Sequence, residues 1–134
     1  MSETDKLLYK ILKILEDRNR IEYTPIADNV VVPAGNYSSF DSVPNNGFTR
    51  ARIFISALFT ENHIGGVTVE LYYGNCRIGR VVTLKSSAGT GTQASEPIDI
   101  SHLSAFNLIV KNHDTSHNTI IKNFKIVLYN EGGF

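Results

Sequence analysis

The chain has 134 residues, and its 13 lysines and arginines balance its 13 aspartates and glutamates, so the formal net charge is zero. This length fits one domain with a short appendage and argues against two full domains. Binders of nucleic acid or anionic membranes carry an excess of basic residues, so we expect no nucleic-acid partner and no anionic membrane surface as a partner. No apolar run approaches the ~20 residues that span a bilayer, so we expect no membrane-spanning segment either.

The N-terminal segment has the pattern of an amphipathic helix. Residues 1–24 contain no glycine or proline, and the apolar positions in 4–19 repeat with the helical period. Thr4 is the expected N-cap residue. We divide the chain into a helix, 1–20, and a domain, 21–134. The apolar stripe of the helix consists of Leu7, Leu8, Ile11, Leu12, Ile14 and Leu15.

This stripe needs a surface to cover it, because a helix of about 15 residues is marginal alone in water. It could dock on its own domain, or it could pack against other copies of the chain. Its terminal position and its width favour self-association, and a wide stripe that mixes leucine and isoleucine suits three or more helices. We therefore expect a homotrimer whose coiled-coil seam contains Leu8, Ile11 and Leu15.

From residue 20 the apolar pattern changes to the period of two that is typical of strands. Turn signals such as Asn45-Asn46-Gly47 separate the runs, and 86–96 is expected to be a loop. About eight or nine strands at this spacing predict a mainly β fold, an antiparallel, jelly-roll-like β-sandwich preceded by one short N-terminal α-helix. The expected strands are 21–24, 29–32, 36–40, 50–60, 67–73, 78–85, 97–100, 106–111 and 120–129.

Two stretches superficially resemble catalytic motifs. The glycine-rich segment 88–92 lacks the lysine that follows the glycines of a P-loop. A serine, histidine and aspartate set could be drawn from Asp99, Ser101 and His102, but a nucleophile elbow is missing, and a local turn explains these residues better. We expect no enzyme activity and no cofactor.

Metal and disulfide chemistry receive little support either. His113 and His117 have the spacing of helical metal ligands, but they fall in an expected polar loop between strands. Solvated histidines are the favoured interpretation, and a weak metal contact is the alternative. Cys76 is the single cysteine, which excludes an intrachain disulfide.

Tyrosines on the expected strands are candidates for ligand binding. Sugar rings stack on aromatic rings while fixed polar groups bind their hydroxyls. Tyr72 and Tyr129 both fall on the outward register of their strands, so they are possible ligand-binding residues, with ordinary strand aromatics as the alternative. Glu70 lies on the same alternating face as Tyr72 and is expected to be a salt-linked surface carboxylate.

The overall plan resembles small virion proteins of tailed bacteriophages, of the head-decoration, head-fibre or tail-appendage type. The likeness is carried by the apolar stripe from Leu7 to Leu15, by the proline- and glycine-rich sandwich from about residue 25, and by strand edges rich in asparagine, serine and threonine. In such proteins a short helix or arm oligomerises or docks, and a β-sandwich projects.

The resemblance implies a non-enzymatic structural protein that self-associates, contacts other virion proteins and belongs to a virion assembled in the host cytoplasm. The sandwich half is also similar to non-catalytic carbohydrate-binding modules. A module that recognises a host or surface glycan is therefore the alternative function.

Overall fold

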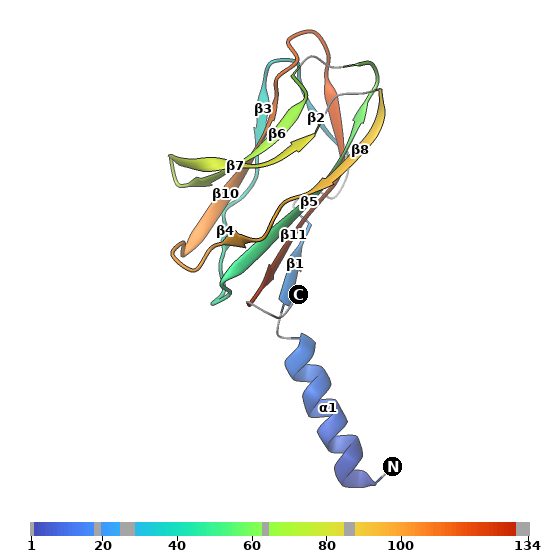
Figure 1. Cartoon of the computed structure of the whole chain (residues 1–134), viewed down its shortest axis with the longest axis vertical. Helices are drawn as coiled ribbons and strands as arrows, with labels where there is room; N and C mark the ends of the chain where they lie inside the picture. The colour runs from blue at the N-terminus through green and yellow to red at the C-terminus, as the bar shows by residue number, and fades with distance from the viewer. Residues whose placement is uncertain (1, 18–19, 25–28, 63–64, 85–87, 131–134) are drawn as a thin grey trace.

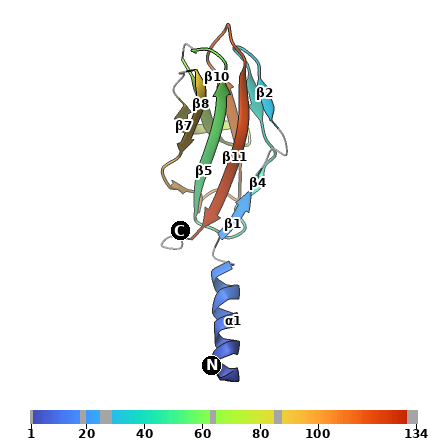
Figure 2. The ribbon, with the colours of Figure 1, turned by 90° about the vertical axis from the view of Figure 1, so that its right-hand side faces the viewer.

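The computed structural model describes residues 2–17, 20–24, 29–62, 65–84 and 88–130. Two antiparallel sheets pack face to face, and α1 (Glu3–Asp17) extends away from one end of this sandwich (Figures 1 and 2). The predicted fold class, a mainly β, jelly-roll-like sandwich preceded in the chain by one N-terminal helix, is confirmed.

The first sheet has the order β1-β11-β5-β8, with β2 added to β11 and β9 added to β5. All its pairs are antiparallel, and β11 and β5 form its long centre. Its strands are β1 (Arg20–Tyr23), β2 (Val30–Val32), β5 (Arg50–Phe59), β8 (Gly89–Ala94), β9 (Ile98–Asp99) and β11 (Thr119–Tyr129).

The second sheet has the order β3-β10-β6-β7, with β4 added to β10. The β6–β7 hairpin turns at Gly74, whose φ of 61° lies in the left-handed region that glycine tolerates. The strands are β3 (Tyr37–Ser39), β4 (Val43–Pro44), β6 (Val67–Tyr73), β7 (Cys76–Leu84) and β10 (Ala105–Asn112).

Two local expectations were wrong. The segment 86–96 is not a loop throughout, because β8 pairs with β5 inside it. Its residues Gly89 to Ala94 lack an apolar alternation, so only the partner strand reveals them as a strand. The helix cap is also displaced: the Ser2 hydroxyl accepts a hydrogen bond from the Asp5 amide at 3.1 Å, so Ser2 takes the role expected of Thr4.

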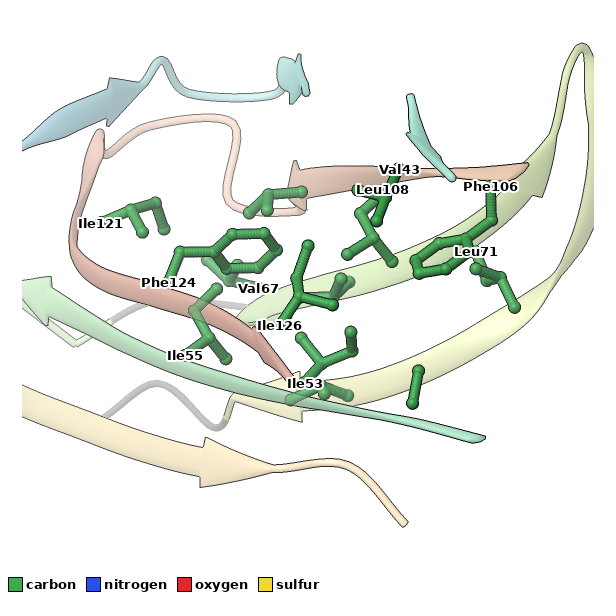
Figure 3. Close-up of a cluster of buried hydrophobic side chains, with 14 of the residues drawn as sticks. Val43, Ile53, Ile55, Val67, Leu71, Phe106, Leu108, Ile121, Phe124 and Ile126 are labelled. Atoms are coloured by element: carbon green, nitrogen blue, oxygen red, sulfur yellow. The ribbon is translucent and has the colours of Figure 1, made fainter. Parts of the chain in front are cut away.

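The core lies between the sheets and is built by alternation. Every second residue of β5, from Ala51 to Phe59, is buried. Figure 3 shows Ile53 and Ile55 of β5 in the same cluster as Phe124 and Ile126 of β11 and Leu71 of β6. Each fully buried side chain of this size stabilises the fold by about 1.5–3 kcal/mol.

A β-bulge in β11 changes which residues face the core. The register with β5 shifts between Ile121 and Asn123, so the alternation is interrupted at Lys122. As a result Ile121 and Phe124, three residues apart, are both fully buried. The ring of Phe124 stacks on that of Phe40, with centroids 4.9 Å apart, which joins β11 to the segment that follows β3.

Candidate functional site

The apolar stripe of α1 is open to solvent. Leu7, Leu8 and Ile11 are 60%, 54% and 46% exposed. The described core residues come from the strands and their connections, and α1 has its main contact with β1, the strand that follows it. The structure therefore does not show the helix docked on its own sandwich. Nor is any helix in the described part of the chain long and apolar enough to cross a membrane.

The rest of the predicted stripe cannot be placed in the same way. Leu12, Ile14 and Leu15 fall within the backbone of α1, but their side chains lie outside the described residues. The open apolar surface is thus established for Leu7, Leu8 and Ile11.

An ion-paired carboxylate lies on the outer face of the second sheet. Glu70 alternates with core residues of β6, yet it is only 4% exposed. Its carboxylate accepts hydrogen bonds from Lys111 Nζ at 2.8 Å and from Arg77 Nη2 at 3.1 Å, and the Tyr72 hydroxyl lies 3.4 Å from it. We call Glu70, Tyr72, Arg77 and Lys111 the Glu70 cluster.

The two cations decide the charge state of Glu70. Hydrogen bonds from Arg77 and Lys111 lower its pKa to about 2, although burial acts in the opposite direction. Glu70 in turn raises the pKa of both cations. The expected salt link is confirmed, but the expected surface position of Glu70 was wrong. Its partners come from β7 and β10, and only the register of three strands brings them together.

Tyr72 faces outward, as expected, but its ring is already engaged. Its hydroxyl accepts a hydrogen bond from Lys111 Nζ at 3.3 Å, and the same ammonium lies 5.8 Å from the ring centroid. This distance is within the range of a cation–π contact. A sugar stacked on Tyr72 would therefore compete with an interaction inside the protein.

Tyr129 lies on the other sheet, so the two tyrosines do not form one site. Its outward register is correct, because the core residues Ile126 and Leu128 alternate with it. The expectation that its ring is open to a ligand was wrong, because Tyr129 is only 5% exposed. Alternation predicts the direction of a side chain and does not predict what covers it.

The two loop histidines are held separately rather than as a metal pair. His113 Nε2 lies 2.7 Å from the Thr68 hydroxyl. His117 lies between two carboxylates, with Nδ1 3.0 Å from Asp114 and Nε2 2.7 Å from Glu61. The bond to Asp114 is the main reason that the pKa of His117 is raised. The described residues contain no group of three or more such ligands arranged for a metal.

The other suggested chemistry has a structural explanation. Asp99 accepts hydrogen bonds from the backbone amide and the hydroxyl of Ser101, at 2.9 and 2.6 Å. Both bonds lower the pKa of Asp99 and form the local turn that the sequence favoured. The glycine-rich segment belongs mostly to β8, and Cys76 is exposed at the start of β7.

A hollow of about 380 Å³ lies on the outer face of the first sheet. The sequence did not identify it, because its residues come from four strands that register brings side by side. We call it the Phe54 hollow; its principal lining residues are Phe54, Ser56, Thr92, Asn123, Lys125 and Val127, with Arg20 and Glu22 of β1 at one side.

Several polar groups of this hollow form hydrogen bonds or ion pairs with one another. The hydroxyls of Ser56 and Thr92 are 2.6 Å apart. Lys125 Nζ lies 3.0 Å from the Glu22 carboxylate, whereas the Arg20 guanidinium is 4.0 Å from the same residue. Its volume falls within the range of about 300–1,000 Å³ that is typical of small-molecule sites.

Comparisons with known proteins find likeness in fold but not in sequence. No protein-family model matches the chain, and no curated protein is detectably similar to it. The CBM36-1 domain of a multidomain xylanase from the hindgut metagenome of Trinervitermes trinervoides matches with a TM-score of 0.51 and 5% identity, over 81% of this chain and 96% of that domain.

Two further solved structures match with lower TM-scores. A carbohydrate-binding module CBM36 in complex with calcium and xylotriose matches with a TM-score of 0.47 and 13% identity, over 79% of this chain and 96% of that one. The structure of infectious bursal disease virus, Gt strain, matches with a TM-score of 0.48 and 11% identity, over 86% of this chain and 32% of the viral chain. At these identities the likeness concerns the β-sandwich alone.

The Glu70 cluster makes the stability of the protein depend on pH, with less stability in acid. Because the pKa of Glu70 falls from 4.5 to about 2 on folding, its stabilising contribution is complete above pH 4.5 and is lost as the pH falls towards 2. We expect Glu70→Gln to lower the free energy of unfolding at pH 7, and we expect the difference from the unmodified protein to shrink between pH 5 and 2. Urea unfolding at a series of pH values measures this difference.

The matched control is Glu96→Gln, which neutralises an exposed carboxylate outside the cluster. Its effect should stay within about 0.5 kcal/mol at every pH, as for most surface substitutions. A Glu70→Gln difference that does not change with pH would contradict the assigned role of the ion pairs.

Proposed function

We propose that the protein is a non-enzymatic structural protein that self-associates through α1, as a trimer, and displays its β-sandwich as a component of a virion. The observation that carries the proposal is the apolar stripe of α1, which the sandwich leaves uncovered. A helix of this length gains little stability alone in water, so another molecule has to cover its apolar face.

Other copies of the chain are the occupant that the charges favour. Residues 1–20 carry five basic and four acidic groups, and residues 21–134 carry eight and nine. Each part is therefore close to neutral, and identical subunits repel one another little when they pack closely. The exposed Leu8 and Ile11 lie three residues apart, the spacing of successive positions in a helical seam.

The shape also suits a subunit of a larger particle. α1 leaves one end of the sandwich, and the loops at the far end point away from it (Figure 1). Such a chain can be held at one end while the other end is presented. Detection of the protein by mass spectrometry in purified, nuclease-treated particles is the expected result, and its absence from intact particles would contradict the virion assignment.

Oligomerisation is tested by a charge placed within the stripe. Leu8→Asp and Ile11→Asp should each weaken assembly, because burying an unpaired carboxylate among apolar helices is costly. Light scattering at micromolar concentration should give three times the chain mass of 14.9 kDa for the unmodified protein and a lower mass for these variants.

Lys10→Glu is the control for this test, since Lys10 lies on the same helix but outside the apolar stripe. It should leave the measured mass unchanged. The circular dichroism of the sandwich should survive in all three variants, because the described core does not include α1. An unmodified chain that is strictly monomeric would refute self-association.

Glycan binding by the sandwich is the second candidate function. The Phe54 hollow favours it, because a partly apolar depression fringed with hydroxyl, amide and charged groups has the composition of a small-ligand site. The full-length protein should give signals on a broad glycan array, with affinities in the micromolar to millimolar range. A uniformly blank array would remove this candidate and leave the assembly proposal unaffected.

A further inference from the structure

We propose that the Phe54 hollow binds a saccharide that carries a carboxylate, such as a uronic or sialic acid residue. This inference rests on glycan binding as the function of the sandwich, and it adds the position of the site and the class of sugar. It places the site on the sheet opposite to the Glu70 cluster and does not use Tyr72.

Strand register builds the site as rows across the outer face of the first sheet. Asn123 of β11, Ser56 of β5 and Thr92 of β8 form one row. Lys125 and Phe54 form the next. A third row contains Glu22 of β1, Val127 of β11 and Arg52 of β5. Figure 2 is viewed towards this face, and no other described helix or strand lies across β5 and β11.

The bulge in β11 is what places Asn123 in its row. Without the register shift between Ile121 and Asn123, a strict alternation from the buried Ile121 would turn Asn123 towards the core. With the shift, Asn123 is exposed opposite Ser56. The irregularity thus adds an amide, both a donor and an acceptor, to a row that otherwise has only hydroxyls.

The rows supply the groups that a sugar ring needs. The partly exposed Phe54 provides apolar surface for the C–H face of a sugar, beside the buried Val127. The Ser56 and Thr92 hydroxyls and the Asn123 amide can exchange hydrogen bonds with sugar hydroxyls. Arg52 lies over the Phe54 ring, with its guanidinium carbon 5.2 Å from the centroid, so a sugar packs against the part of the ring that this cation does not cover.

Charge selects an acidic sugar over a neutral one. The chain as a whole is neutral, but the lining of the hollow contains two basic residues and one acidic residue. Lys125 is closely paired with Glu22, whereas the Arg20 guanidinium reaches that carboxylate only at 4.0 Å. Arg20 therefore keeps hydrogen-bond donors for a ligand carboxylate. The charged residues that line the hollow are Arg20 and Lys125, against Glu22.

The test compares a matched pair of sugars, sialyllactose and lactose, with the full-length protein in isothermal titration or by NMR shifts. The acidic sugar should bind at least about tenfold more tightly, a difference of about 1.4 kcal/mol. Raising the salt concentration should weaken the binding of the acidic sugar and leave that of lactose unchanged, because added ions screen exposed charges. Trigalacturonic acid serves as a second acidic probe that carries its carboxylates on a different sugar.

Variants then locate the site. Arg20→Gln should remove the preference for the acidic sugar, while Phe54→Ala and Asn123→Ala should weaken acidic binding about tenfold or more. Arg80→Gln removes an exposed cation on the second sheet, and Tyr72→Ala removes the competing ring, so both should bind as the unmodified protein does. A thermal melt of each variant shows that the fold is retained.

The outcomes separate the site from the function. If the protein binds acidic sugars but Arg20→Gln, Phe54→Ala and Asn123→Ala bind equally well, the hollow is not the site, although glycan binding stands. If binding is lost only in Tyr72→Ala, the site is at the Glu70 cluster and not in the hollow. If neither acidic probe binds at millimolar concentration, the proposed ligand class is wrong, and a blank glycan array would refute glycan binding as well.

Discussion

The register between the antiparallel strands β5 and β11 positions both the core residues and the outer hollow of the first sheet. These strands are paired along almost their whole length and form the centre of the first sheet. Because side chains alternate along a strand, the same pairing supplies two surfaces at once. One surface contains Ile53, Ile55 and Phe124 of the core, and the other carries the Phe54 hollow. Any change in register would alter both surfaces together.

That dependence explains which features could be predicted from the sequence. The helix and most of the strands follow from the period of their apolar residues, a local property. β8 does not, because its glycines and threonines show no such period and it forms by pairing with β5. The number of strands was underestimated for the same reason, since short strands such as β4 depend on their partner.

The candidate sites show the same division more sharply. The exposed stripe on α1 could be read from the sequence, since helical spacing alone places Leu7, Leu8 and Ile11 on one face. The burial of Glu70 and Tyr129 could not be predicted in this way, because alternation gives the direction of a side chain and not what covers it. The Phe54 hollow is the extreme case. It needs the β11 bulge, the position of β1 and the pairing of β8, and a single sequence reveals none of these.

The attachment of the sandwich to α1 through β1 has a consequence for binding strength. β1 both follows the helix and lines the Phe54 hollow, so bundling the helices would bring several hollows together around one axis. Once one hollow of such an assembly holds a polymer, the others meet its neighbouring residues at an effective concentration of about millimolar. Individually weak sites would then act together, and avidity rather than single-site affinity would govern retention on a surface coated with repeating sugars.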